Sequence, residues 1–177
     1  TAVNDAPTLT TISTITGGAE DTFKEITYAD LAAAANEADV DSASISFRIE
    51  AVSTGTLEKS DGLGGWSAVT PGTTLIASGD TVRWRGASNA NGTLNAFTVK
   101  AYDGTSASAT AVQVQVDTAA VNDVPVAVAD SRTINEGATD TAFNILANDT
   151  DAETSVASLT VAQINGTAFA SLDSSTS

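Results

Sequence analysis

The sequence predicts an all-β protein made of Greek-key β-sandwich units in tandem, and three observations indicate this. Thr, Ser, Val and Ala dominate the composition while strong helix formers are scarce, which favours short strands joined by small polar turns. Apolar and polar residues alternate with period two along several segments. The element A-V-N-D-x-P occurs at residues 2–7 and again at 120–125. This recurrence sets a period of about 118 residues, the size of one β-sandwich.

The repeat divides the chain into two predicted domains. Residues 1–120 are expected to form one complete sandwich. Residues 121–177 are expected to form the N-terminal part of a second repeat, truncated or partly disordered, because they cover only about half of the period.

The expected elements of the first unit follow from local patterns. The Thr/Ile-rich segment 9–15 reads as a strand, and residues 30–37 as a short helix that Asp30 caps. Ile45, Phe47 and Ile49 alternate with polar residues, as in a strand with one buried face. Further strands are expected around 75–76, 81–85, 94–102 and 107–116, with an Asn91-Gly92 hairpin turn. About seven strands result, enough for a Greek-key sandwich.

Charge and missing residue types narrow the function. The 22 acidic and 7 basic residues give a formal net charge of -15, whose field repels nucleic acid and anionic membrane surfaces. Cys and His are absent, so disulfides and the usual zinc ligands are excluded. No segment approaches the roughly 20 apolar residues of a membrane span, so membrane insertion is not expected.

Acidic residues gather in turns and joints, where their oxygens can bind a hard cation. Asp39 and Asp41 lie two residues apart, Asp103 precedes a glycine, and Asn122-Asp123 lies in the repeated joint. Glu20 follows a Gly-Gly break and adds another carboxylate. Calcium takes 6 to 8 oxygens at about 2.3 to 2.6 Å and accepts such mixed sets, whereas magnesium prefers to keep its waters. These residues predict a Ca²⁺ site.

The same elements recur in the second unit. Glu136 corresponds to Glu20, and Asp149-Thr-Asp151 is taken to correspond to Asp39-Val-Asp41, with Leu159 and Val161 beginning the next strand. A single acidic pair usually binds only water. Two pairs in one register are stronger evidence for a metal.

These motifs resemble tandem cadherin-like repeats of large secreted bacterial adhesins of the RTX type. The resemblance is carried by Glu20, A-D-V-D-S, A-Y-D-G and V-N-D-V-P, with Asp117 upstream. It implies that a joint between units is coordinated by Glu20, Asn122, Asp123, Asp149 and Asp151. It implies a matching site at the other end of the first unit, formed by Asn4, Asp5, Asp39, Asp41 and Asp103. The turn and joint motifs are shorter than in the family, which implies one or two ions per joint.

The function implied by the resemblance is a calcium-stiffened extender or stalk of a secreted adhesin at the bacterial cell surface, supporting adhesion or biofilm attachment. Its partners would be the neighbouring repeats of the same polypeptide. The alternative is a glycan-binding module that contacts cell-surface or matrix glycans, in which Trp66 after Gly64-Gly65 stacks on a sugar ring. Trp84 alternates with Arg83 and Arg85, which favours a core position for its side chain.

Catalysis is not expected. Acyl transfer through a Ser or Thr hydroxyl needs a base, and the chain has no histidine. The paired carboxylates that a glycosidase would use lie here in metal-ligand spacing at the domain ends.

Overall fold

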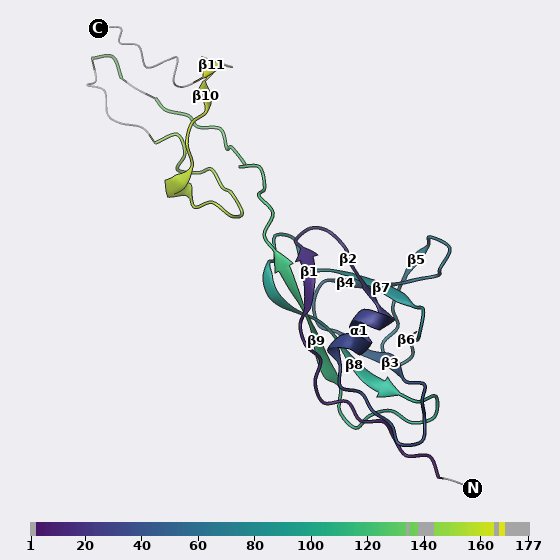
Figure 1. Ribbon diagram of the computed structural model, residues 1–177. Helices are drawn as coiled ribbons and strands as arrows, with labels where there is room; N and C mark the ends of the chain where they lie inside the picture. Colours follow the sequence, from purple (N-terminus) through teal and green to yellow (C-terminus); the bar gives the residue numbers. More distant parts are fainter. Residues whose placement is uncertain (1–2, 134, 138–143, 165–166, 169–177) are drawn as a thin grey trace. The chain divides into compact units, whose positions relative to one another are not determined.

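In the computed structural model (Figure 1), the described residues are 3–133, 135–137, 144–164 and 167–168. The chain forms two compact units, Thr1–Val121 and Asn122–Ser177. Each unit is described by itself. Residues 134, 138–143, 165–166 and 169–177 of the predicted second repeat lie outside the described part.

The first unit contains two β-sheets. The five-stranded sheet has the order β1 (Ile15–Ala19), β9 (Val112–Ala119), β8 (Gly92–Tyr102), β3 (Ser46–Val52) and β6 (Leu75–Ile76). The four-stranded sheet has the order β2 (Lys24–Thr27), β7 (Thr81–Arg85), β4 (Thr56–Ser60) and β5 (Trp66–Ala68). Strand β1 runs parallel to β9, and the other neighbours are antiparallel. The predicted all-β class is confirmed.

Both sheets contribute to one hydrophobic core. Phe47 and Ile49 of β3 and Val99 of β8 are fully buried, as are Val82 and Trp84 of β7. Each such side chain stabilises the fold by about 1.5–3 kcal/mol through removal of apolar surface from water. The Trp84 indole N–H donates to the carbonyl of Thr54 at 2.8 Å, so its polar atom is satisfied. The expected core position of Trp84 is confirmed.

The single α-helix of the described residues, α1 (Tyr28–Ala34), begins two residues before the predicted start. Its N-cap is Thr27, and Asp30 is the third helical residue. The Thr27 hydroxyl accepts the Asp30 amide at 3.1 Å, while the Asp30 carboxylate accepts the Thr27 amide at 2.8 Å. This reciprocal pair is a capping box. The backbone hydrogen bond from Thr27 lowers the pKa of Asp30.

The predicted strand over residues 9–15 is wrong for most of its length. Before β1 begins at Ile15, this range contains one isolated bridge, from Ile12 to Ala35, and a second isolated bridge joins the preceding Thr8 to Ala38. The Asn36 side-chain oxygen accepts the amides of Thr10 and Thr11, at 3.0 and 2.9 Å. A side chain thus takes up backbone donors that a sheet ladder would use.

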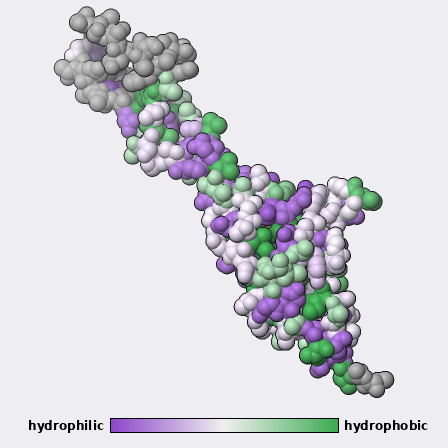
Figure 2. Space-filling model, in the orientation of Figure 1, coloured by the Kyte–Doolittle hydropathy of each residue, from purple (hydrophilic) through white to green (hydrophobic). Residues whose placement is uncertain are grey.

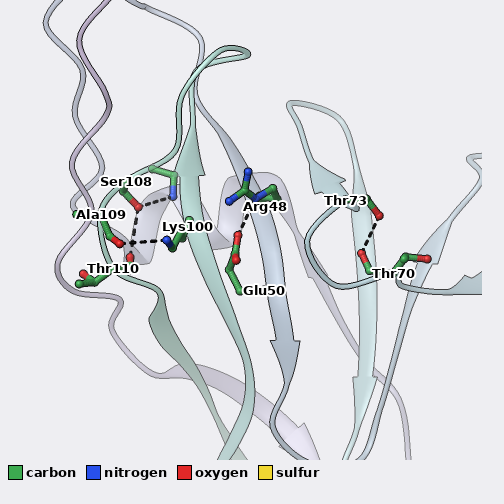
Figure 3. A network of polar contacts seen from close by, with 9 residues as sticks. Arg48, Glu50, Thr70, Thr73, Lys100, Ser108, Ala109 and Thr110 are labelled. Atoms are coloured by element: carbon green, nitrogen blue, oxygen red, sulfur yellow. Dashed lines mark hydrogen bonds and ion pairs between the residues drawn. The ribbon is translucent and has the colours of Figure 1, made fainter.

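The last strand is also displaced from its predicted range, 107–116. Residues 103–111 form a loop before β9, which Figure 3 shows from close by. The buried Ser108 hydroxyl accepts the Ala101 amide at 3.1 Å, and the Lys100 ammonium donates to the Ala109 carbonyl at 3.0 Å. These bonds anchor the loop that carries Asp103 to the end of β8.

The turn between β4 and β5 ends in an exposed apolar tip, which is green in Figure 2. Leu63 at this tip is 93% exposed. The Asp61 carboxylate accepts the amides of Leu63 and Gly65, both at 2.8 Å. The turn is therefore organised by one Asp side chain.

The described part of the second unit contains a 3₁₀ turn, η1 (Val156–Ser158), and a short hairpin of β10 (Gln163–Ile164) and β11 (Thr167–Ala168). An isolated bridge joins Val126 to Thr150. Across all the described residues, no helix is long and apolar enough to span a membrane.

Candidate calcium site

Five predicted ligands lie together in loops of the first unit, and we call them the N-terminal acidic cluster: Asn4, Asp5, Asp39, Asp41 and Asp103. The Asn4 side-chain amide donates to the Asp103 carboxylate at 2.9 Å. The Asp5 backbone amide donates to the Asp41 carboxylate at 3.1 Å. Segments about 35 and 100 residues apart in the sequence are thereby joined, as the predicted site requires.

Asp39 and Asp103 each shape their own turn. One Asp39 oxygen, Oδ1, accepts the amides of Asp41 and Ser42, at 2.9 and 2.8 Å. One Asp103 oxygen accepts the amides of Thr105 and Ser106, at 2.6 and 2.7 Å. Asp side chains stabilise turns in this way. The second Asp39 oxygen, Oδ2, is buried and has no hydrogen-bond partner.

The cluster perturbs its own carboxylates. Hydrogen bonds from the Asp41 and Ser42 amides lower the pKa of Asp39, although the Asp103 charge opposes this. The hydrogen bond from the Asp5 amide acts to lower the pKa of Asp41. The hydrogen bond between the Asp41 and Asp39 carboxyls and the charges of Asp39 and Asp5 outweigh this effect, so the pKa of Asp41 is raised. The charges of the Asp39 and Asp41 carboxylates repel each other. An added cation would relieve the repulsion between them.

The donor set fits calcium. It consists of carboxylate and amide oxygens, and the unpartnered Asp39 Oδ2 offers a buried carboxylate oxygen that no protein donor satisfies. Among the residues that the structure describes, no three acidic side chains are already gathered closely enough to hold a metal ion. The cluster is linked in pairs through hydrogen bonds.

Glu20 lies directly after β1 and contacts the C-terminal residue of the first unit. Its side chain is 2% exposed, and its carboxylate accepts the Val121 amide at 2.6 Å and the Asn91 side-chain amide at 3.1 Å. Glu20 therefore fixes the backbone at the last residue of the first unit. Its coordination of an ion together with residues of the second unit stays a prediction.

The second unit repeats four hydrogen bonds of the N-terminal acidic cluster and its turn. The Asn122 side chain donates to the Asp123 carbonyl at 2.8 Å, as that of Asn4 does to Asp5 at 2.9 Å. The Asp123 amide donates to the Glu153 carboxylate at 2.8 Å. One Asp151 oxygen accepts the amides of Glu153 and Thr154, at 3.1 and 2.6 Å.

These bonds correct the predicted register by two residues. Asp151 holds its turn as Asp39 does, and Glu153 accepts from Asp123 as Asp41 accepts from Asp5. The expected correspondence of the Asp149–Asp151 pair with Asp39–Asp41 is therefore wrong. Segments 35–42, A-N-E-A-D-V-D-S, and 147–154, A-N-D-T-D-A-E-T, align without a gap when Asp is allowed to replace Glu.

Asp149 and Glu153 consequently have different environments. Asp149 is 7% exposed, and its carboxylate accepts the Val128 amide at 2.8 Å. Glu153 is exposed and contacts the joint at Asp123. Glu153 is not part of a D-x-D pair, so the motif of paired Asp residues does not identify it. The shared A-N-x-x-D frame was the signal that could have found it.

Trp66, the candidate sugar platform, is partly covered by a cation. The Arg83 guanidinium lies 4.4 Å from the Trp66 ring centroid and 4.2 Å from that of Phe23. Glu58 holds the same guanidinium by hydrogen bonding and an ion pair. Such cation–π stacking stabilises the outer face of the sheet without any bound sugar. A sugar would have to use the ring surface that Arg83 leaves open.

No protein-family model, no curated protein and no solved structure matches this chain.

Proposed function

We propose that the chain is a calcium-stiffened extender module of a large secreted bacterial surface adhesin, built from cadherin-like sandwich repeats of Greek-key topology. One observation carries this proposal: the same Asn-Asp segment and acidic turn make the same hydrogen bonds in both units. Asp41 and Glu153 are different residues, yet each accepts the equivalent backbone amide. This supports the same role for the two segments.

Calcium would act on the carboxylates of this geometry. Without the ion, acidic side chains at one end of a unit repel one another. The bond from the Asp5 amide opposes a rise in the pKa of Asp41, but the hydrogen bond with the Asp39 carboxyl, burial and the charges of Asp39 and Asp5 outweigh it and raise this pKa. A bound Ca²⁺ removes the repulsion and adds bonds to oxygens from separate segments. Ligands contributed by two consecutive units would restrict the bending of the chain between them.

The proposed ligands at the joint are those expected from the sequence, Glu20, Asn122, Asp123, Asp149 and Asp151, and we add Glu153. Glu153 joins this set because its carboxylate already contacts Asp123. The N-terminal acidic cluster would form the same site with a preceding repeat. Such modules would act at the bacterial cell surface and hold an adhesive tip away from the cell.

Small-angle scattering tests this function on the full chain. With calcium, we expect a longer maximum dimension and a narrower particle than with chelator. The difference should disappear in Asp123→Asn/Asp151→Asn. Asp61→Asn is the matched control, because Asp61 organises an isolated turn with the same kind of hydrogen bonds. Identical scattering profiles with and without calcium would overturn the stiffening mechanism.

A further inference from the structure

The second unit contains an apolar hollow of about 880 Å³ within its own residues. Its lining includes Val128, Ile145, Leu146, Leu159 and Val161. Val128 is 46% and Ile145 39% exposed, although both are large apolar side chains. An open apolar surface of this kind usually marks an interaction site.

The first unit indicates which structure suits this hollow. Leu159 and Val161 follow the Asp151 turn by the same numbers of residues as Phe47 and Ile49 follow the Asp39 turn. Phe47 and Ile49 are fully buried. They lie on β3, opposite Ala101 and Val99 of β8. In the first unit, the positions that correspond to the hollow are therefore closed by an antiparallel strand with apolar residues at alternate positions.

The backbone beside the hollow is available for the same pairing. Within the described residues, 159–162 belong to no strand, and the neighbouring β10 pairs with β11 alone. Unpaired backbone groups next to an apolar surface favour the addition of a strand, since this satisfies the hydrogen bonds and covers the side chains together.

We propose that this hollow is the docking surface for an antiparallel β-hairpin of the β8–β9 type, whose first strand pairs with residues 159–162 and whose alternate apolar side chains fill the cavity. The occupant is a polypeptide with the chemistry of residues 94–116, in which apolar residues such as Phe97, Val99 and Val114 point to one face. The strand pairing at residues 159–162 involves no proposed calcium ligand, although Asp149, which is one, also lines the hollow.

A synthetic hairpin with the sequence of residues 92–119 is the probe, added to the full chain. Hydrogen exchange of the Thr160, Val161 and Ala162 amides should slow by about tenfold or more, since these amides become paired. The same peptide carrying Phe97→Asp and Val99→Asp should have no effect. Binding should be lost in Val161→Asp and kept in Leu63→Asp, whose site is the exposed turn of the first unit.

Three results would overturn the proposal. One is unchanged exchange at 160–162 with excess peptide, and another is equal protection by both peptides. The third is peptide-free dimerisation that Val161→Asp abolishes, since a second copy would then be the occupant. If Val161→Asp perturbs the unit without peptide, the milder Val161→Thr should weaken peptide binding while the emission of the first unit's Trp84 stays unchanged.

Discussion

The Glu153 carboxylate accepts the backbone amide of Asp123 at 2.8 Å. The corresponding bond in the first unit runs from Asp5 to Asp41 and measures 3.1 Å. In each unit, a carboxylate two residues into an acidic turn thus holds the segment that enters the unit. Asp41 and Glu153 differ in length by one methylene, and the feature that they share is a carboxylate oxygen next to the entering backbone.

Glu153→Gln should weaken calcium binding by the second unit about tenfold, or about 1.4 kcal/mol, because it removes a charged ligand. The stability of the metal-free protein should change little, since the amide of Gln still accepts from Asp123. Titration of the Asp123 and Glu153 amide signals by NMR measures this affinity. Unchanged affinity would exclude Glu153 from the ligand set.

Asp149→Asn should affect the fold of the second unit first. The buried Asp149 carboxylate accepts the Val128 amide, and a weaker neutral bond should lower the free energy of unfolding by about 1–2 kcal/mol. Hydrogen exchange of the Val128 amide in chelator reports this loss. If Asp149→Asn reduced calcium affinity and left exchange unchanged, Asp149 would be a ligand without a structural role.

Calcium binding by the N-terminal acidic cluster should weaken on acidification sooner than an ordinary pair of Asp residues predicts. The pKa of Asp41 is raised above its usual value of about 3.9, so protons compete with calcium at a higher pH. In the metal-free protein, acidification acts in the opposite direction on folding stability. A raised pKa means that protonation of Asp41 favours the folded state, so this contribution is present at low pH and is lost as pH rises.

Calorimetric titrations at a series of pH values check this dependence. Asp41→Asn should lower the affinity at neutral pH and flatten the pH profile, because the titrating group is gone. Asp61→Asn should leave the profile unchanged. A profile that is identical in the wild-type protein and Asp41→Asn would contradict the role assigned to Asp41.

Asp80→Asn should destabilise the first unit by about 1 kcal/mol, given that a partly exposed ion pair contributes little beyond its hydrogen bonds. Its carboxylate accepts the Lys59 ammonium at 2.7 Å and the Ala77 amide at 2.8 Å. Partial burial acts to raise the pKa of Asp80, but these hydrogen bonds outweigh it and lower the pKa. The stabilisation is therefore present above the unfolded pKa and disappears as pH falls through the folded one. In urea unfolding, the difference in stability between the two proteins should be smaller at pH 3 than at pH 7.

Quenching of tryptophan fluorescence tests the glycan alternative. Trp84 is buried and should resist acrylamide, whereas Trp66 should be partly accessible. Arg83→Gln should increase quenching of Trp66, because the guanidinium covers one part of its ring. A soluble neutral glycan that protects Trp66 from the quencher would favour sugar binding, and Trp66→Ala should then abolish that binding.

The all-β class and much of the core could be predicted because their signals are local. Phe47 and Ile49 are marked by period-two alternation, and Trp84 by its charged neighbours. The early start of α1 was also within reach, since Thr27 and Asp30 have capping-box spacing. The isolated bridges around residues 9–15 were not, because they depend on Asn36, a side chain distant in sequence.

The candidate site was predicted by residue type and only partly by register. Asn4, Asp5, Asp39, Asp41 and Asp103 were identified from motifs, and the structure links them through hydrogen bonds in pairs. Glu153 was missed because a search for identical D-x-D pairs stops at Asp149. The bond from Asp123 reveals it, and this bond joins residues 30 positions apart. The contact itself cannot be read from the sequence, although the A-N-x-x-D frame shared by segments 35–42 and 147–154 aligns Glu153 with Asp41.

Isothermal titration of calcium into the chelator-treated full chain measures whether the two acidic sites bind the ion. We expect binding with a dissociation constant of roughly 0.1 to 1 mM, in the range of extracellular calcium modules. Removal of the ligands in Asp39→Asn/Asp41→Asn should abolish the sites of the first unit, and Asp123→Asn/Glu153→Gln those of the second. Two results would contradict calcium binding at these sites. One is the absence of heat and of any thermal shift at a calcium concentration about 10-fold above the upper end of this range. The other is binding that all four substitutions leave intact.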